Sequence, residues 1–499
     1  STAFQIADDF DLVRGNHQIA FGANIIHENS KTLNTRTMNG AFTFNGQVTG
    51  LGLADFLVGA MGSSFIQSNP IIEDEKLTYI GAYIQDDWKV KPNLTLNVGL
   101  RWEPYKPIQA GTGWASNFDL ARFSAGTKST VYPQAPAGLL FNGDAGMPDA
   151  SVMNANWKMF APRIGMVWTP LGDSRMTVRA AYGIFYDSPH LFFNTRFANN
   201  PPWGAQVGVT NSAPGGLTNP WSTYPGGNPW PNLATNWATS AFPQFGVYVN
   251  SPLDLNNQAL HNWNLSVQRQ AGDWLFGASY LGNHMSHLWV ATELNPALYA
   301  AGATTGNINQ RRVLYQANQA VGQFYGSIAQ MGDFGRANYA GLLLSAQRRL
   351  KDGFSVLANW TLSKCMTDPG TNEITGATII NPDNKTGEYG PCQADRRHVV
   401  NLSVIYTTPS FANRTLGMIL GGWQIAPILR LQTGDHASIT TGVDNALSGI
   451  GGQRAVQVLD SPYGDGTFSN YLNPAAFTTP AAGTYTTLGP NSIENPGNI

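Results

Sequence analysis

The stretch that decides the fold is "KVKPNLTLNVGLRWEPY", residues 89–105, where large apolar side chains alternate with polar or small ones. The apolar positions are Leu94, Leu96, Val98, Leu100 and Trp102; the positions between and after them are Thr95, Asn97, Gly99, Arg101 and Glu103. Successive residues of a β-strand point to opposite faces, so this stretch predicts a strand with one apolar and one polar face. The same alternation returns along the whole chain.

The composition narrows the class of protein. Only 12% of the 499 residues are charged, which is about half the usual share for a soluble globular protein. Yet the mean hydropathy is -0.19, and no run approaches the roughly 18 apolar residues that a spanning helix needs. Abundant Gly and aromatic residues favour a transmembrane β-barrel, although a secreted β-rich protein would share them. The net charge of -2 gives no electrostatic reason to bind nucleic acid or anionic lipid headgroups.

Segments of period two form pairs that are joined by short turns rich in Gly, Pro, Asn or Asp. The expected hairpins are 3–14 with 17–28, 77–90 with 94–105, 159–169 with 175–187, 261–270 with 274–285, 339–350 with 354–364, and 397–407 with 416–432. Long aperiodic segments separate them, at 29–76, 106–158, 188–260, 286–338, 365–396 and from 433 onward. Short turns alternating with long loops are typical of outer-membrane barrels and rare in compact soluble domains. A soluble sandwich or propeller is the alternative, but its polar face should carry more Lys and Glu.

One segment has helical rather than alternating spacing. In "GLGLADFLVGAMG", residues 50–62, the apolar residues Leu53, Phe56, Leu57, Ala60 and Met61 fall on one face of a helix. The sequence therefore predicts a short helical insert, with two short strands at 41–46 and 63–68 beside it. With these strands the expected total is 12 to 14, in an all-β antiparallel transmembrane barrel that is only partly complete.

No catalytic constellation is present, and the sequence predicts neither an enzyme nor a cofactor. His284 and His287 stand three apart, which on a strand puts them on opposite faces, so a shared metal is not expected. The carboxylates in 368–388 lack the order of an EF-hand loop, and the default interpretation is a solvated loop. Cys365 and Cys392 would close one loop by a disulfide in an oxidising compartment; the alternative is two unpaired thiols.

The long segment 188–260, interpreted as an extracellular loop, is aromatic and carries no charged residue between 199 and 245. Its candidate ligand-contact residues are Trp203, Trp221, Tyr224, Trp230 and Trp237. Exposed tryptophans stack on sugar faces or anchor protein partners, and neighbouring Asn side chains hydrogen-bond hydroxyls. The alternative is a loop whose aromatic rings pack on one another.

A second set of candidates lies on the polar face of the predicted strands, where it would line the lumen. This set consists of Arg101, Glu103, Arg163, Arg179, Gln268 and Arg349. In the lumen these side chains would either meet a plug domain or pair with one another.

Several segments carry a family resemblance. "YIGAYIQDDWKVKPNLTLNVGLRWEPY" (79–105) and "FAPRIGMVWTPLGDSRMTVRAAYGIFYD" (160–187) resemble the strand–turn–strand signature of TonB-dependent outer-membrane receptors. "NYAGLLLSAQRRLKDGFSVLANWTLSK" (338–364) and "DRRHVVNLSVIY" (395–406) are similar to barrel segments of the Oar-like group, common in acidobacteria. The resemblance implies a Gram-negative outer membrane, outer-membrane lipid, TonB and a plug domain as partners, and at least 22 strands. Residues 1–499 would then be an internal part of the barrel, without plug, early strands or final strands, and with two unpaired sheet edges.

The function that this resemblance implies is energy-coupled import of a bulky, scarce nutrient. The uncharged aromatic loop favours a carbohydrate or a peptide over a siderophore. The alternatives are a surface adhesin or protein-export pore built on the same barrel, and a passive porin.

Overall fold

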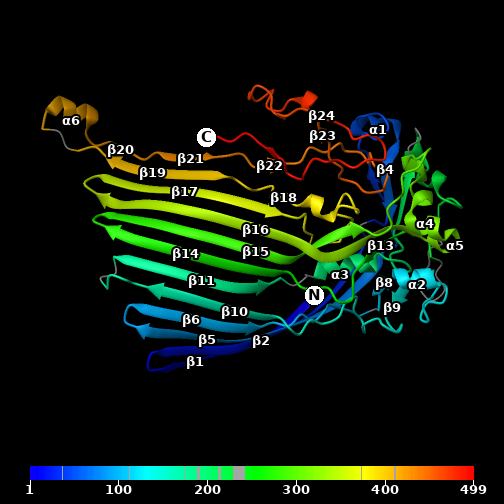
Figure 1. Ribbon diagram of the computed structural model, residues 1–499, viewed down its shortest axis with the longest axis horizontal. Coiled ribbons are helices and arrows are strands. Elements are labelled where there is room, and N and C mark those ends of the chain that lie inside the picture. The colour runs from blue at the N-terminus through cyan, green and yellow to red at the C-terminus, as the bar shows by residue number, and fades with distance from the viewer. Residues whose placement is uncertain are drawn as a thin grey trace.

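The computed structural model describes residues 1–35, 37–111, 113–172, 175–187, 191–211, 215–228, 242–371, 374–409 and 412–498. Within them a curved wall is built from twelve antiparallel strands, each hydrogen-bonded to the next (Figure 1). In order they are β1 (Thr2–Arg14), β2 (His17–Asn34), β5 (Ile71–Lys91), β6 (Leu94–Trp102), β10 (Phe160–Trp168), β11 (Met176–Tyr186), β14 (Ala259–Ala271), β15 (Trp274–Glu293), β16 (Tyr325–Lys351), β17 (Phe354–Thr367), β19 (His398–Thr407) and β21 (Ile428–Gln432). Among the described residues, β1 pairs only with β2, and β21 pairs only with β19. The sheet therefore has two free edges, as expected.

The two rims of the wall differ as predicted. Tight turns such as 15–16, 92–93, 272–273 and 352–353 lie at the left rim in Figure 1, and the long connections gather at the right rim. We call this right-hand assembly the loop layer. It contains β3 (Ala41–Thr43), α1 (Gly52–Val58), β4 (Met61–Gln67), β7 (Gln109–Ala110), β8 (Ser116–Phe118), α2 (Leu120–Ala125), β9 (Leu139–Phe141), α3 (Leu191–Ala198), β12 (Val207–Asn211), β13 (Gly246–Asn250), α4 (Val313–Ala317), α5 (Gln319–Gly322), β18 (Gly390–Pro391), β22 (His436–Ala437), β23 (Val456–Gln457), β24 (Phe477–Thr478) and β25 (Ile493–Glu494).

The wall keeps its two faces distinct from strand to strand. Residues directly opposite each other in adjacent strands share a face, so the register carries one face around the sheet in a single row. This row is Val98–Ile164–Tyr182–Trp263–Gly282–Ala340–Lys364. Val98 and Ile164 are 51% and 53% exposed, which gives the outward face an apolar band that needs hydrocarbon around it.

The packed core of the molecule lies in the loop layer and not in the wall. Its largest cluster joins residues from four connections and from the loop-side ends of β5, β15 and β16, including the fully buried rings of Trp114, Phe141, Phe193, Tyr248 and Trp289. Because so many large side chains are removed from water there, the long loops form one folded body over the barrel rim. None of the described helices is long and apolar enough to cross a bilayer.

The structure corrects the sequence interpretation of the last hairpin. Residues 416–420 were expected in a strand, but they belong to α6 (Arg414–Leu420), which lies at the turn rim and is followed by β20 (Gln424–Ile425). The side chain of Asn413 caps this helix by accepting hydrogen bonds from the backbone N–H groups of Thr415 (2.9 Å) and Leu416 (3.1 Å). Such a cap satisfies orphan donors of the first turn and outweighs a weak alternation of apolar residues.

In the segment 50–62 the structure has α1, with its apolar face turned to the outside. Leu53, Phe56 and Leu57 are between 52% and 75% exposed, whereas Asp55 is fully buried. The Asp55 carboxylate accepts the backbone N–H groups of Gly46 (2.9 Å) and Thr49 (2.8 Å) and the Thr49 hydroxyl (2.7 Å). The carboxylate can be buried because these donors replace its water, and it turns the polar side of the helix inward.

Candidate functional site

The loop layer contains a cavity of about 520 Å³, whose lining mixes polar groups with the apolar side chains of Ile66, Val209, Phe245, Val247, Ile308, Val443 and Ile450. Its walls come from five connections that are far apart in sequence, around residues 43–47, 206–247, 305–327, 375 and 442–452. The polar side chains that line it are Thr43, Asn45, Gln47, Gln206, Thr305, Asn309, Arg312, Ser327, Thr375 and Asp444. Most of these groups are uncharged amides and hydroxyls, which both donate and accept hydrogen bonds.

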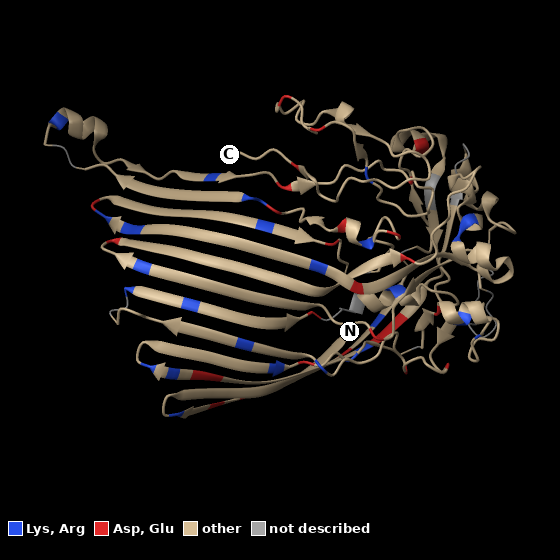
Figure 2. Cartoon of the chain, viewed as in Figure 1, with Lys and Arg blue, Asp and Glu red and all other residues tan. Residues whose placement is uncertain are grey.

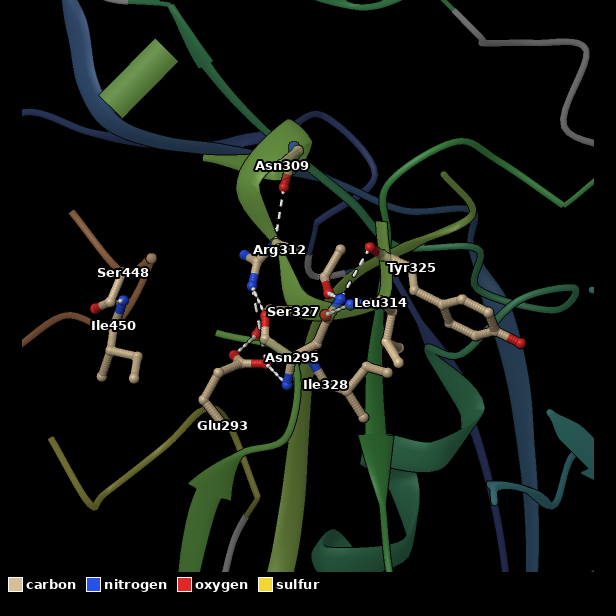
Figure 3. A network of polar contacts seen from close by, with 12 residues as sticks. Glu293, Asn295, Asn309, Arg312, Leu314, Tyr325, Ser327, Ile328, Ser448 and Ile450 are labelled. Carbon is tan, nitrogen blue, oxygen red and sulfur yellow. Dashed lines mark hydrogen bonds and ion pairs between the residues drawn. The ribbon is translucent and has the colours of Figure 1, made fainter. Parts of the chain in front are cut away.

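A buried arginine forms one wall of the cavity (Figure 3). Arg312 is 5% exposed; its Nη1 donates to the carbonyl oxygen of Asn295 (2.5 Å) and its Nε donates to Oδ1 of Asn309 (3.0 Å). Nη1 also lies 3.8 Å from Oε1 of Glu293. Burial lowers the pKa of the Arg312 guanidinium, and the carboxylates of Glu293 and Asp444 oppose that shift. The arginine therefore fixes the wall and is not a free cation.

Glu293 and Asn295 hold the ends of the strands below this wall. Oε1 of Glu293 accepts the N–H groups of Asn295 and Ile328, both at 2.9 Å, and Oε2 accepts the hydroxyl of Ser327 at 2.5 Å. The amide of Asn295 donates to the carbonyl oxygens of Tyr325 (3.1 Å) and Gly326 (2.7 Å) and accepts the N–H of Leu314 (2.9 Å). This network, drawn in Figure 3, leaves each partner satisfied and makes the wall rigid.

The opposite wall is a loop that Asp444 organises. Its Oδ2 accepts the N–H of Gly449 (2.7 Å), and its Oδ1 accepts the N–H of Ser448 (3.2 Å) and Nε2 of Gln453 (2.5 Å). Burial raises the pKa of Asp444, while these hydrogen bonds act to lower it. At Gly449, φ is +83° and an added Cβ would stand 3.1 Å from Nη2 of Arg312, so the position needs glycine.

Contacts beside the cavity connect the loops that follow β2 and β21, near the two free edges of the sheet. The side-chain amide of Asn45, which follows β2, donates to the carbonyl oxygen of Gly442 at 2.6 Å. The backbone N–H of Asp444 donates to Oε1 of Gln47 at 3.3 Å. Residues 442–444 follow β21, so the connections after β2 and after β21 meet in the loop layer although those two strands are not paired.

The cavity offers amides, hydroxyls, glycine backbone and apolar side chains. Its two charged side chains, Arg312 and Asp444, both hydrogen-bond to neighbouring groups. Within the described ranges, three or more His, Cys, Asp or Glu side chains nowhere come together as a metal site.

The predicted aromatic ligand contacts are buried where the structure describes them. Trp203, Trp221 and Tyr224 are 3%, 4% and 8% exposed. Trp203 packs edge-on against Phe141, and Trp221 packs edge-on against Tyr224. Their rings fill the interior of the loop layer, which agrees with the alternative of a loop that packs on itself, and a ligand-contact role for these three stays a prediction. Trp230 and Trp237 lie outside the described residues.

The predicted lumen residues mostly pair with neighbours on the wall. Nε of Arg101 lies 2.8 Å from Oε2 of Glu103, and Nη1 of Arg179 donates to Oε1 of Gln268 at 2.9 Å. The Arg163 guanidinium lies over the ring of Phe185, 4.6 Å from its centroid. Arg349 is exposed next to an irregularity between β16 and β17 that interrupts the alternation, so its register does not assign it to the lumen.

Two covalent or ionic links hold the loop layer to the end of the wall. Cys365 and Cys392 form a disulfide, which was one of the two alternatives. Arg454 and Glu388 form a buried two-pronged ion pair, with nitrogen–oxygen distances of 2.7 and 3.1 Å. The pair ties the segment after β21 to the connection between β17 and β19.

Sequence reasoning missed the cavity residues. Asn45, Gln206, Arg312 and Asp444 lie in different aperiodic loops, and no spacing relates them. The only local signal was the cluster of glycines at 449–452 in "SGIGGQ", which marks a place where backbone and side chains approach closely.

Comparison with solved structures finds barrels of about twice this length. The outer membrane transporter YddB from Escherichia coli is 13% identical, with 89% of this chain and 43% of that chain covered and a TM-score of 0.46. The FrpB iron transporter from Neisseria meningitidis is 12% identical, with 93% of this chain and 44% of that chain covered and a TM-score of 0.40. The siderophore receptor PirA from Pseudomonas aeruginosa is 11% identical, with 86% of this chain and 45% of that chain covered and a TM-score of 0.36. This chain thus spans less than half of each.

No curated protein matches the sequence. The profile of the family described as "Outer membrane beta barrel domain" matches residues 1–499, the whole chain. The wall of antiparallel strands, with its exposed apolar outward band, is the architecture that such a domain requires. The chain belongs to the outer membrane β-barrel domain family.

Proposed function

We propose that this chain forms much of the barrel wall and the outer vestibule of an energy-coupled outer-membrane transporter of the Oar-like, TonB-dependent type. TonB and a plug domain would be its partners, and outer-membrane lipid would surround the apolar band. The observation that carries the proposal is the combination of a lipid-facing wall with a preformed cavity over its loop-side rim. A pore for small solutes alone would need no such preformed cavity.

The cavity favours a neutral ligand such as a carbohydrate or a peptide. Its lining combines amides, hydroxyls and glycine backbone with apolar side chains, and the charge of Arg312 is already engaged. A binding site for a negatively charged iron chelate would be expected to present free cations. The proposed substrate is therefore a bulky, hydroxyl- or amide-rich nutrient.

Filling the cavity tests its role. Gly451 lines it, and a Cβ added there would meet nothing within 4 Å, so Gly451→Trp should fill space without straining the backbone. Gly489 is equally unobstructed but does not line this cavity, which makes Gly489→Trp the matched control. Cells expressing the full-length gene would be given fluorescent oligosaccharide and peptide mixtures.

We expect uptake of one mixture to fall at least tenfold in Gly451→Trp and to stay unchanged in Gly489→Trp. A protonophore should abolish uptake by the unchanged protein, because energy coupling needs the proton gradient. Uptake that persists with the protonophore would indicate a passive porin, and equal uptake by both variants would remove the cavity from the pathway.

A further inference from the structure

The outward face of one sector of the wall is basic at its margins. The sector consists of residues 176–186, 259–271, 274–286, 336–348, 354–366 and 398–406, on β11, β14, β15, β16, β17 and β19. Its outward positions contain no Asp or Glu. Their basic side chains and histidines are His261, Arg269, His284, Arg336, Arg348, Lys364 and His398. In Figure 2, β14 and β17 accordingly carry blue and no red.

The register places these cations on the lipid side. Lys364 lies opposite Ala340, in the same row as the exposed Val98 of the apolar band. Asn338 is on the same face as Ala340, two residues closer to the loop layer. It lies opposite His284 on β15, and His284 lies opposite His261 on β14. The N-terminal side of the wall differs, because its outward face carries the carboxylates Asp8 and Asp86 beside Arg14 and His17. The charge of -2 for the whole chain hides this asymmetry.

Two of the loop-side groups, His284 and Arg336, are connected through Asn338 and Tyr389. Nδ1 of His284 is 2.8 Å from Oδ1 of Asn338, whose Nδ2 donates to the hydroxyl of Tyr389 at 2.7 Å. The guanidinium of exposed Arg336 lies over the Tyr389 ring, 4.5 Å from its centroid. The nearby carboxylate, Asp368, is 7% exposed and accepts the backbone N–H of Arg336.

The spacing of the cations matches a bilayer. Arg336 and Arg348 are both outward on β16 and twelve positions apart. At about 3.3 Å per residue they are separated by about 40 Å along the strand. A strand tilt of about 40° reduces this to about 30 Å along the membrane normal, which is the thickness of the hydrocarbon core. The two arginines thus lie at the levels of the two headgroup layers.

We propose that the loop-side cluster, Arg336, Lys364, His284, Asn338 and Tyr389, binds the phosphate-bearing headgroup of a lipid in the adjacent leaflet. Lys364 and Arg336 supply charge, and His284, Asn338 and the Tyr389 hydroxyl supply hydrogen bonds. The occupant is a lipid and not free phosphate, because the cluster continues directly into the apolar band that holds acyl chains. The net charge of -2 gives no electrostatic reason to bind anionic headgroups, so the proposal rests on the local arrangement of cations.

The test measures lipid retention by the purified full-length protein. The protein is incubated in detergent with equal amounts of phosphatidylglycerol and phosphatidylcholine, and bound lipids are counted by native mass spectrometry. We expect the unchanged protein to retain phosphatidylglycerol at least fivefold over phosphatidylcholine. Arg336→Gln with Lys364→Gln should remove most of this preference.

The matched control also removes two positive charges, by Arg179→Gln with Arg430→Gln, on the inward face. This control should keep the preference for phosphatidylglycerol. A second control, Arg336→Lys with Lys364→Arg, conserves the charge and should also keep the preference, which shows that the site can be altered without unfolding the protein. Equal retention of the two lipids by the unchanged protein would overturn the proposal. So would a preference that survives in the Gln double variant, or one lost equally in the inward control.

Discussion

At the scale of single residues, Glu75 has the most unusual environment. It lies on the part of β5 that extends beyond the end of β6, since Trp102 pairs with Ala82, and its strand partners are Ser30 of β2 and Ala110 of β7. Glu75 is 3% exposed and its Oε1 has no hydrogen-bond partner. Burial, followed by repulsion from Glu73 and Glu28, raises the pKa of Glu75 to about 8.

This raised pKa predicts a stability that depends on pH. In the unfolded chain the Glu75 pKa returns to about 4.3, so the folded state binds the extra proton between that value and about 8. The free energy of unfolding is then highest below pH 4.3 and falls as the pH rises through 8. Glu75→Gln should remove this fall and raise stability at pH 8.5, relative to the unchanged protein, by on the order of a few kcal/mol.

Urea unfolding of both proteins at pH 5 and pH 8.5 measures the difference. Glu28→Gln, which removes only a repelling neighbour, should give a smaller effect of the same sign. Parallel pH profiles for Glu75→Gln and the unchanged protein would contradict the assignment.

At the scale of elements, the disulfide fastens the end of β17 to the segment that leads into β19. Cys365 and Cys392 are 27 residues apart in sequence, and the N–H of Cys392 also donates to the carbonyl oxygen of Cys365 at 3.1 Å. Closing a loop of this length restricts the unfolded chain and typically contributes about 2–4 kcal/mol. We expect Cys365→Ser with Cys392→Ser to lower the urea midpoint accordingly, and reductant to reproduce the loss only in the unchanged protein.

The sequence predicted elements well where one local rule decided them. Strands around Val98 and Trp360 were recognised because alternation alone specifies a two-faced strand, and the turns at Gly272 and Gly353 fixed their ends. The prediction failed at 416–420, where Asn413 caps a helix in place of a strand. The helix in 50–62 was predicted, but the burial of Asp55 decides which of its faces points inward.

The candidate site was predictable only in its general location. The sequence analysis predicted ligand recognition in the loops. However, the tryptophans that it named as candidate ligand contacts, such as Trp203 and Trp221, are part of the core of the loop layer. Their size makes them the residues that gain most from burial. The lining of the cavity comes from Asn45, Gln206 and Asp444, which come together only through the fold.

At the scale of the whole molecule, the two faces of the wall predict opposite responses to one substitution. Val98 is on the outward face and 51% exposed, so Val98→Arg places a charge on the lipid-facing surface at a cost of up to about 2–4 kcal/mol. Asn97 is on the inward face, where its Nδ2 donates to Oδ1 of Asp87 at 2.5 Å, so Asn97→Arg keeps a carboxylate partner.

Urea unfolding of the full-length protein in lipid vesicles compares the two variants. Val98→Arg should lower the free energy of unfolding by the stated amount, and Asn97→Arg should change it by less than about 1 kcal/mol. An equal loss in both variants would mean that the apolar band does not face lipid.

The hydrogen bonds from Asn45 to Gly442 and from Asp444 to Gln47 each bridge 397 positions of sequence. These contacts cannot form until the whole stretch from Asn45 to Asp444 has been delivered to its destination. The vestibule is therefore completed late in folding. A polypeptide truncated before Gly442 would lack these contacts and have an incomplete loop layer, however well its first hairpins had assembled.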